Sequence, residues 1–288
     1  MPDILKPNIN ISDETLDLKN TNNYILSIIV SLDQLSFCIL DTTRNKYIAL
    51  KSYQLQNIYN FQVFCEKFAQ LITQTNFLKN TYKSVKIIFA NKKSTLIPLP
   101  LFEKDKKDTY LKFNHNIEEE SIIYDKLDSP EAYNIYALPK CVETKLKDTF
   151  STYKINHHSS CLIESLLFQY KNQDTEEKMF VNVSNSYFDI IVIKNKELLL
   201  YNYFNYKTCE DFIYFILFVL EQLKLNPENI DLILLGNIEK RSDLYQILYK
   251  YIRNISFGKR NDTFKYSYVF DDLGSHSFYN LLNSNICE

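Results

Sequence analysis

Residues 179–236 carry the pattern that most restricts how this chain of 288 residues can fold. Three short apolar runs, separated by turn-like breaks, lead into a helical pattern that is apolar on almost every side, CEDFIYFILFVLEQLKL. One more apolar run, IDLILLGN, follows the helix. The short breaks predict antiparallel pairing of the first three strands, and the helix predicts a right-handed crossover to a parallel fourth strand.

The same order of elements occurs earlier in the chain. Strands are predicted at residues 24–31, 35–40, 46–55 and 85–90, with a helix at residues 59–78 before the last of them. In that helix Phe61, Phe64, Phe68, Leu71 and Ile72 recur at spacings of three and four residues. The two segments share few identical residues, so it is the order of elements that indicates a duplicated α/β lobe. A solenoid would repeat at a much shorter period.

The segment between the two patterns predicts an insertion, which begins as an extended stretch punctuated by Pro98 and Pro100. Helices are expected at residues 102–113, 140–150 and 159–170, strands at 121–127 and 133–138, and Ser159 or Asn156 as the cap of the last helix. Beyond the second pattern we expect a helix at 241–252 capped by Ser242, short strands at 255–257 and 266–270, and a helix from Ser277. We divide the chain into a flexible N-terminal arm at 1–22, a first lobe with inserted strands and helices at 23–172, and a second lobe at 173–288.

Charge and hydropathy argue against two kinds of partner. The formal net charge of −2 gives no global field that would attract nucleic acid. The longest apolar run in the helix of the 179–236 pattern, residues 212–220, is far shorter than the ~20 residues that span a bilayer. The N-terminal residues are polar and acidic and do not resemble a signal peptide. We therefore expect a cytoplasmic protein that neither inserts into a membrane nor binds nucleic acid.

The cysteines are scattered and predict free thiols. They are Cys38, Cys65, Cys141, Cys161, Cys209 and Cys287. No two of them form a C-x-x-C pair, and most lie inside apolar patterns. Buried thiols in a reducing compartment are the expected state, without a disulfide or a metal site.

Glycine is scarce, and this excludes the common phosphate-binding loops. The chain has three glycines, at Gly236, Gly258 and Gly274, where average usage of about 7% would give roughly twenty. Loops that wrap phosphates need glycine because their backbone N–H groups approach the ligand closely, often at positive φ. With no glycine before position 236, the chain holds neither a P-loop nor a G-x-G-x-x-G fingerprint.

The duplicated pattern resembles the lobes of the actin-like ATPase superfamily, which have a ribonuclease H-like fold. More narrowly, TLIPLPLF followed by YLKFNH, then YNIYALP, HHSSCLIESLL and the ending HSFYNLLNSNICE are similar to a family of uncharacterised bacterial proteins with a degenerate actin-like fold. The resemblance covers the chain from about residue 24 to residue 287. It implies an α/β protein of duplicated ribonuclease H-like lobes, with mixed sheets flanked by helices. The family has no assigned activity, so the resemblance implies a fold and no reaction.

Nucleotide-binding members of the superfamily place an Asp-x-Gly turn between the first two strands of each lobe. Its backbone N–H groups grip the phosphates and its carboxylate positions Mg²⁺. The first turn here, residues 31–34, keeps Asp33 without a glycine, and the second, residues 184–186, has neither residue. Where the superfamily has a Gly-Gly pair at the adenosine, this chain has Gly236 alone. Asp33 and Gly236 are the cofactor-binding candidates if nucleotide binding is retained, and no cofactor is expected.

Each candidate residue also has a plainer explanation. Asp33 in a tight hairpin can bond its own backbone, and Gly236 can be required by the geometry at the end of a strand. His157 and His158 could be metal ligands, but neighbours in an extended chain point in opposite directions. A capping or loop role before the next helix is therefore the plainer explanation for both. His115 and His276 are isolated, and the sequence supports no Ser/His or Cys/His set.

We therefore expect a non-catalytic scaffold or pseudo-enzyme that binds a protein partner and has lost tight nucleotide binding. The alternative is an atypical ATP-binding protein or phosphotransferase that uses the cleft between its lobes. A ribonuclease H-like nuclease is disfavoured, because several carboxylates must converge on two metal ions. The first strand carries none, and only Asp33 and Asp41 are near it. No catalytic residue and no metal site is predicted.

Overall fold

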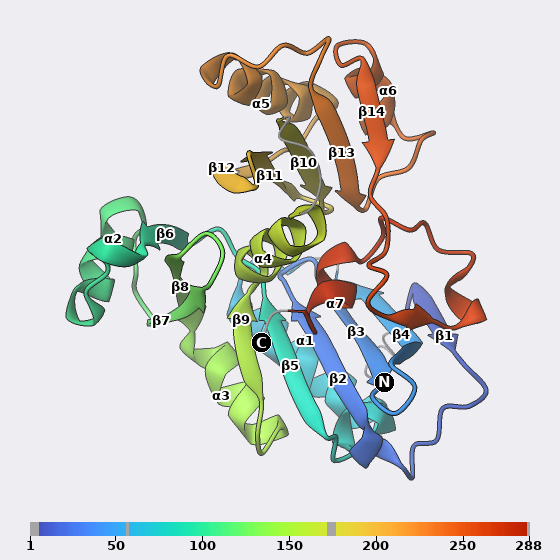
Figure 1. Cartoon of the computed structure of the whole chain (residues 1–288). Coiled ribbons are helices and arrows are strands. Elements are labelled where there is room, and N and C mark those ends of the chain that lie inside the picture. The colour runs from blue at the N-terminus through green and yellow to red at the C-terminus, as the bar shows by residue number, and fades with distance from the viewer. Residues whose placement is uncertain (1–5, 56–57, 172–176, 287–288) are drawn as a thin grey trace. The chain divides into compact units, whose positions relative to one another are not determined.

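The computed structural model describes residues 6–55, 58–171 and 177–286 (Figure 1). The chain divides into two compact units. The first comprises the residues up to Cys161 together with Asp262–Asp272, and the second comprises Leu162–Asn261 with Leu273–Glu288. The lobe boundary predicted between residues 172 and 173 lies outside the described residues. The division falls instead within helix α4 (His158–Tyr170).

Strand β2 is the centre of a mixed sheet in the first unit. The strands that follow the predicted order are β2 (Tyr24–Val30), β3 (Gln34–Asp41), β4 (Lys46–Gln54) and β5 (Ser84–Phe89). β2 pairs antiparallel with β3 and parallel with β5, while β3 pairs antiparallel with β4. The predicted hairpins and the parallel crossover are confirmed.

Helix α1 (Phe61–Gln74) forms the crossover between β4 and β5. Asn60 caps it, its side-chain oxygen accepting a hydrogen bond from the N–H of Val63. Phe64, Phe68 and Leu71 lie on the face that packs into the core with β2 and β3. The helix is shorter than the predicted 59–78, because extended backbone at Thr75 ends it before a 3-10 helix at Asn76–Lys79.

Three further short strands, only the last of which overlaps a predicted strand (residues 266–270), extend the first sheet, which has the order β1-β4-β3-β2-β5-β9 with β15 also on β4. They are β1 (Ile9–Ser12), β9 (Lys154–His157) and β15 (Lys265–Tyr266). β1 pairs antiparallel with β4, so the expectation of a flexible arm was wrong for residues 9–12. β15 pairs parallel with β4, and Asp262–Asp272 belong to the first unit. The prediction had assigned these residues to the second lobe.

The insertion forms a separate antiparallel sheet in the order β6-β8-β7. Its elements are β6 (Ser94–Pro98), α2 (Lys107–Asn114), β7 (Glu120–Leu127) and β8 (Ala132–Pro139), followed by α3 (Lys140–Thr149). Leu111 of α2 packs with Ile122, Ile135 and Ala137 of the sheet. The helix begins later than the predicted residue 102, because 3-10 turns occupy Leu99–Leu101 and Lys104–Lys106.

The second unit repeats the order of the first. Its elements are β10 (Lys178–Val183), β11 (Tyr187–Lys194), β12 (Glu197–Asn205), α5 (Cys209–Gln222), β13 (Asp231–Gly236), α6 (Asp243–Tyr249), β14 (Asn254–Phe257) and α7 (Tyr279–Asn283). The sheet order is β12-β11-β10-β13-β14, with β10 antiparallel to β11 and parallel to β13. Thr208 and Asp211 form a capping box at the start of α5, and Ser242 caps α6 as predicted. In the ranges that the structure describes, no helix is both long enough and apolar enough to cross a membrane.

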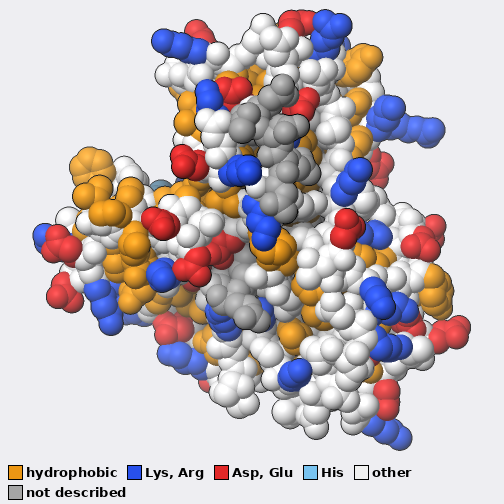
Figure 2. Space-filling model, in the orientation of Figure 1, with side chains coloured by type: hydrophobic (Ala, Val, Ile, Leu, Met, Phe, Trp, Pro, Cys, Tyr) orange, Lys and Arg blue, Asp and Glu red, His pale blue; other side chains and the backbone are white. Residues whose placement is uncertain are grey.

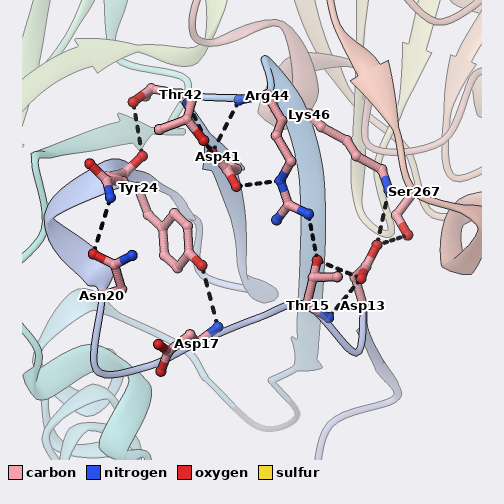
Figure 3. A network of polar contacts seen from close by, with 12 residues as sticks. Asp13, Thr15, Asp17, Asn20, Tyr24, Asp41, Thr42, Arg44, Lys46 and Ser267 are labelled. Atoms are coloured by element: carbon pink, nitrogen blue, oxygen red, sulfur yellow. Dashed lines mark hydrogen bonds and ion pairs between the residues drawn. The ribbon is translucent and has the colours of Figure 1, made fainter.

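A polar clasp, formed by Asp13, Arg44, Lys46 and Ser267, ties the segments that follow β1 and β15 to the first sheet (Figure 3). Ser267 Oγ donates to Asp13 Oδ2, and Lys46 Nζ lies 3.1 Å from the same oxygen. Arg44 Nη1 donates to Thr15 Oγ1 at 2.9 Å, and its Nε lies 2.6 Å from Asp41 Oδ2. Burial acts to raise the pKa of Asp13, but hydrogen bonds from Ser267, Thr15 and Lys46 outweigh it and hold the pKa well below its usual range.

Replacement of Asp13 should therefore destabilise the first unit. In Asp13→Ala, buried Ser267 and partly buried Lys46 lose their shared acceptor, and we expect the free energy of unfolding to fall by about 2–3 kcal/mol. Urea denaturation followed by circular dichroism measures this change. Glu14→Ala is the matched control at an exposed neighbour, where we expect less than about 0.5 kcal/mol. Equal effects of the two substitutions would contradict a role for the clasp.

Candidate functional site

The turn that carries Asp33 is closed by its own hydrogen bonds. Between β2 and β3, the N–H of Ser31 donates to the carbonyl of Gln34 at 3.0 Å. The hydroxyl of Ser31 lies 2.6 Å from Asp33 Oδ1 and accepts a hydrogen bond from the N–H of Gln34 at 3.0 Å. The carbonyl of Asp33 accepts from the N–H of Leu55 at 2.9 Å. The Asp33 carboxylate therefore takes part in hydrogen bonding within its own turn, through the hydroxyl of Ser31.

The corresponding turn of the second unit, between β10 and β11, is closed in the same way. The N–H of Ser184 donates to the carbonyl of Tyr187 at 2.8 Å. Tyr206 binds the turn from the outside, its hydroxyl donating to the carbonyl of Ser184 at 2.7 Å and its N–H to that of Ser186 at 3.2 Å. The short polar side chains of this turn are thus joined by an aromatic residue that follows β12 (Glu197–Asn205).

Gly236 ends β13 in a conformation that only glycine adopts easily. Its φ is +80°, and a Cβ atom there would lie 2.3 Å from the carbonyl oxygen of Val183. The N–H of the next residue, Asn237, donates to that same oxygen at 2.7 Å, while Asn237 Nδ2 donates to Asn185 Oδ1 at 2.6 Å. The equivalent position of the first unit is Phe89, paired with Val30. Parallel pairing alone therefore does not require glycine, and the positive φ and the close approach do.

Asp33 and Gly236 belong to different units, and each is explained by contacts within its own unit. Their assignment as nucleotide-binding residues stays a prediction. Among the described residues, no group of three or more His, Cys, Asp and Glu side chains could hold a metal ion. None of the described cysteines, which exclude Cys287, forms a disulfide bond.

A buried polar cluster in the first unit was not expected from the sequence. We call it the Asp125 cluster, and it comprises Asp125, Asn134, Tyr136, His157, Ser159 and Ser160. These residues come from β7, β8, β9 and the first turn of α4, and all are at most 7% exposed. The cluster therefore joins the inserted sheet to the edge of the main sheet.

Asp125 accepts the hydrogen bonds at the centre of this cluster. Its Oδ2 accepts from the N–H of His157 at 2.7 Å and from Ser160 Oγ at 2.6 Å, and its Oδ1 from the hydroxyl of Tyr136 at 3.2 Å. Burial raises the pKa of Asp125 to about 6, although the hydrogen bonds from Ser160, His157 and Tyr136 act in the opposite direction.

The imidazole of His157 is held on both of its nitrogens. Nδ1 lies 2.7 Å from Ser159 Oγ, and Nε2 lies 3.1 Å from the carbonyl oxygen of Asn91. Burial, reinforced by the neighbouring His158, lowers the pKa of His157 well below its usual value, so the ring is neutral at physiological pH. Both histidines are buried at the junction of β9 and α4, where a loop or capping role had been expected.

The Asp125 cluster contains serine, histidine and aspartate, but it lacks the arrangement of a nucleophilic triad. In such a triad the imidazole lies between the serine and the carboxylate. Here Asp125 binds the backbone N–H of His157, and the second ring nitrogen faces the carbonyl of Asn91. The geometry supports positioning of the chain and not acyl transfer. Asp125 and Asn134, polar residues inside apolar strands, were the only sequence signal of the cluster.

Two remaining histidines make single contacts with the backbone. His115 Nε2 lies 3.2 Å from the carbonyl oxygen of Ser94, and His276 Nε2 lies 2.7 Å from that of Ile238. Burial lowers the pKa of His276. Neither histidine contributes to a catalytic set.

Comparison with known proteins identifies the architecture. A family described as "Protein of unknown function (DUF3822)" matches residues 13–255. A Bacteroides thetaiotaomicron crystal structure, described as a protein with actin-like ATPase fold and unknown function, aligns with a TM-score of 0.80 and 25% identity over 95% of this chain and 100% of that one. No curated protein matches the chain.

Two more distant structures share the fold alone. The PilM-PilN type IV pilus biogenesis complex contains a chain that aligns with a TM-score of 0.59 and 10% identity, covering 91% of this chain and 97% of that one. The ethanolamine utilization protein EutJ from Carboxydothermus hydrogenoformans aligns with a TM-score of 0.51 and 6% identity, covering 96% and 93%. The predicted actin-like α/β fold, and the resemblance to an uncharacterised family that has it, are confirmed.

The raised pKa of Asp125 predicts a pH dependence of stability. Between the unfolded value of 3.8 and the folded value of about 6, the folded state binds more protons, so stability falls as pH rises through this window. A shift of roughly two pKa units corresponds to about 3 kcal/mol. Asp125→Asn, which cannot titrate, should remove this part of the slope in urea denaturation measured across the window.

The exposed Asp128→Asn serves as the control and should keep the wild-type slope. The comparison between variants cancels the titration of other carboxyl groups. An unchanged slope in Asp125→Asn would show that Asp125 is ionised in the folded protein throughout the window, against the effect of burial.

Proposed function

This chain belongs to the DUF3822 family of proteins of unknown function, and on that premise we propose that it is a non-catalytic scaffold that binds a protein partner. The proposal rests on an actin-like fold in which the two turns expected to bind phosphates lack the Asp-x-Gly pattern of nucleotide-binding members.

The closed turns are the observation that carries the proposal. In nucleotide-binding relatives, turns at these positions direct backbone N–H groups at phosphates. Here the N–H groups of Ser31 and Ser184 donate within their own hairpins, at 3.0 and 2.8 Å. The hydroxyls of Ser31 and Tyr206 also bind these turns, at Asp33 and at the carbonyl of Ser184. This bonding favours loss of tight nucleotide binding.

The inserted sheet offers an apolar surface for a partner. Leu99, Leu101 and Phe113, which we call the insert patch, are 39%, 65% and 88% exposed. They lie on the 3-10 turn after β6 and on α2, and Figure 2 shows hydrophobic side chains gathered over this part of the molecule. Clustered exposed apolar side chains are typical of protein interaction sites.

The similarity to the PilM-PilN structure is consistent with this role. That structure is a complex, so one chain with this fold works in contact with another protein. At 10% identity the comparison supports the proposal by analogy of fold only.

Substitution of the insert patch tests the scaffold function. We expect a variant with Leu101→Ser and Phe113→Ser to fold normally and to lose cross-linked partners that the wild-type protein captures in its native cells, as measured by quantitative mass spectrometry. The matched control carries Tyr249→Ser and Tyr251→Ser, two residues of similar exposure in the second unit, and should keep those partners. Identical partner sets for the two variants would contradict the insert patch as the binding surface.

A thermal-shift titration with Mg·ATP and Mg·ADP tests the other half of the proposal. A ligand at a hundred times its dissociation constant stabilises the folded state by about 2.7 kcal/mol, and we expect no such stabilisation here. Stabilisation that Asp33→Asn abolishes would instead support the alternative, an atypical ATP-binding protein or phosphotransferase.

A further inference from the structure

A pocket in the first unit lies apart from the turns and from the insert patch. Its volume is about 510 Å³, within the range of small-molecule sites. Residues from β1 and β4 line one side, and residues after the end of α1 line the other. Those that matter for its chemistry are Ser12, Leu16, Lys51, Tyr53, Thr75 and Phe77.

The floor of the pocket is apolar and held by the core. Phe77 and Tyr53 are 4% and 5% exposed, and both contact the ring of the fully buried Phe37, with centroids 5.1 and 6.0 Å away. The hydroxyl of Tyr82 fixes the backbone here by donating to the carbonyl of Phe77 at 2.6 Å. Because these residues belong to the main core, the floor is formed before any ligand arrives.

Among the described residues of the lining, Lys51 is the only charged one. Its Nζ lies 5.5 Å from the centroid of the Phe77 ring, so the ammonium group stands over the aromatic floor. No ion pair to Lys51 occurs in the part of the chain that the structure describes. The described lining therefore presents one positive charge, apolar side chains and the neutral polar side chains of Asn10, Ser12, Gln74 and Thr75.

We propose that this pocket binds a small organic carboxylate with an apolar body. The body would lie on the floor formed by Phe77, Tyr53 and Leu16, and the carboxylate would pair with Lys51. A single lysine suits a monoanion, because phosphate groups carry more charge and are usually held by arginine clusters or several N–H donors.

Titration of the full-length, isotope-labelled protein by nuclear magnetic resonance tests this. The probes are hydrocinnamate and octanoate, each compared with its neutral amide. We expect saturable shifts of the amide signals of the pocket residues with the carboxylates, and binding weaker by about tenfold or more with the amides, as expected for loss of one ion pair in a partly desolvated site.

Variants of Lys51 test whether its ammonium group is the charge that pairs with the ligand carboxylate. Lys51→Gln should bind the carboxylates about as weakly as the wild-type protein binds the amides, and Lys51→Arg should keep the wild-type affinity for the carboxylates. Lys92→Gln, an exposed lysine outside the lining, is the control and should bind as the wild type does. The proposal fails if neither carboxylate saturates the pocket at millimolar concentration, if the amides bind equally well, or if Lys51→Gln and Lys92→Gln behave alike.

Discussion

The structure depends on one physical constraint. The buried central strands, β2 and β10, must hydrogen-bond their backbone N–H and C=O groups on both edges. An unpaired N–H or C=O group in such a strand costs about 1–3 kcal/mol. β2 pairs with β3 on one edge and β5 on the other, and β10 pairs with β11 and β13. Each central strand therefore ends beside both a hairpin turn and the end of a parallel strand. The resemblance to the actin-like ATPase superfamily implies phosphate-binding turns at these ends.

What this chain places at those ends explains its proposed loss of nucleotide binding. The fold requires a turn there, but it does not require the turn to bind a ligand. Ser31 and Tyr206 use hydroxyl groups to complete the hydrogen bonding of the turns internally. The element order thus does not require glycine in these turns, since it is maintained by strand pairing and by apolar burial. Gly236 remains because the backbone of β13 approaches Val183 too closely for a side chain.

Polar contacts between segments far apart in the sequence hold β1, β15 and the inserted sheet to the main sheet of the first unit. Ser267 reaches Asp13 from near the other end of the chain, and Asp125 joins the inserted sheet to β9 and α4. Both carboxyl groups are buried, yet their pKa values shift in opposite directions. Asp13 accepts hydrogen bonds that outweigh its burial, whereas burial dominates at Asp125. Such networks stabilise the fold only while every partner is present, since a buried carboxylate without its donors is costly.

The sequence by itself determined the repeated strand and helix order, the antiparallel hairpins, the insertion and the absence of glycine-rich phosphate loops. These follow from apolar periodicity, short breaks and composition, which act between near neighbours. It missed β1 and β9 and gave the wrong bounds for β15, because strands of two to four residues carry almost no periodic signal and form only against a strand already in place. It also left Asp33 and Gly236 with two explanations each, and it gave no hint of the pocket at Lys51. Only the tertiary structure gave the contacts of these two residues and the pocket, because hydrogen-bond partners, a positive φ and the lining of a cavity depend on residues brought together from distant parts of the chain.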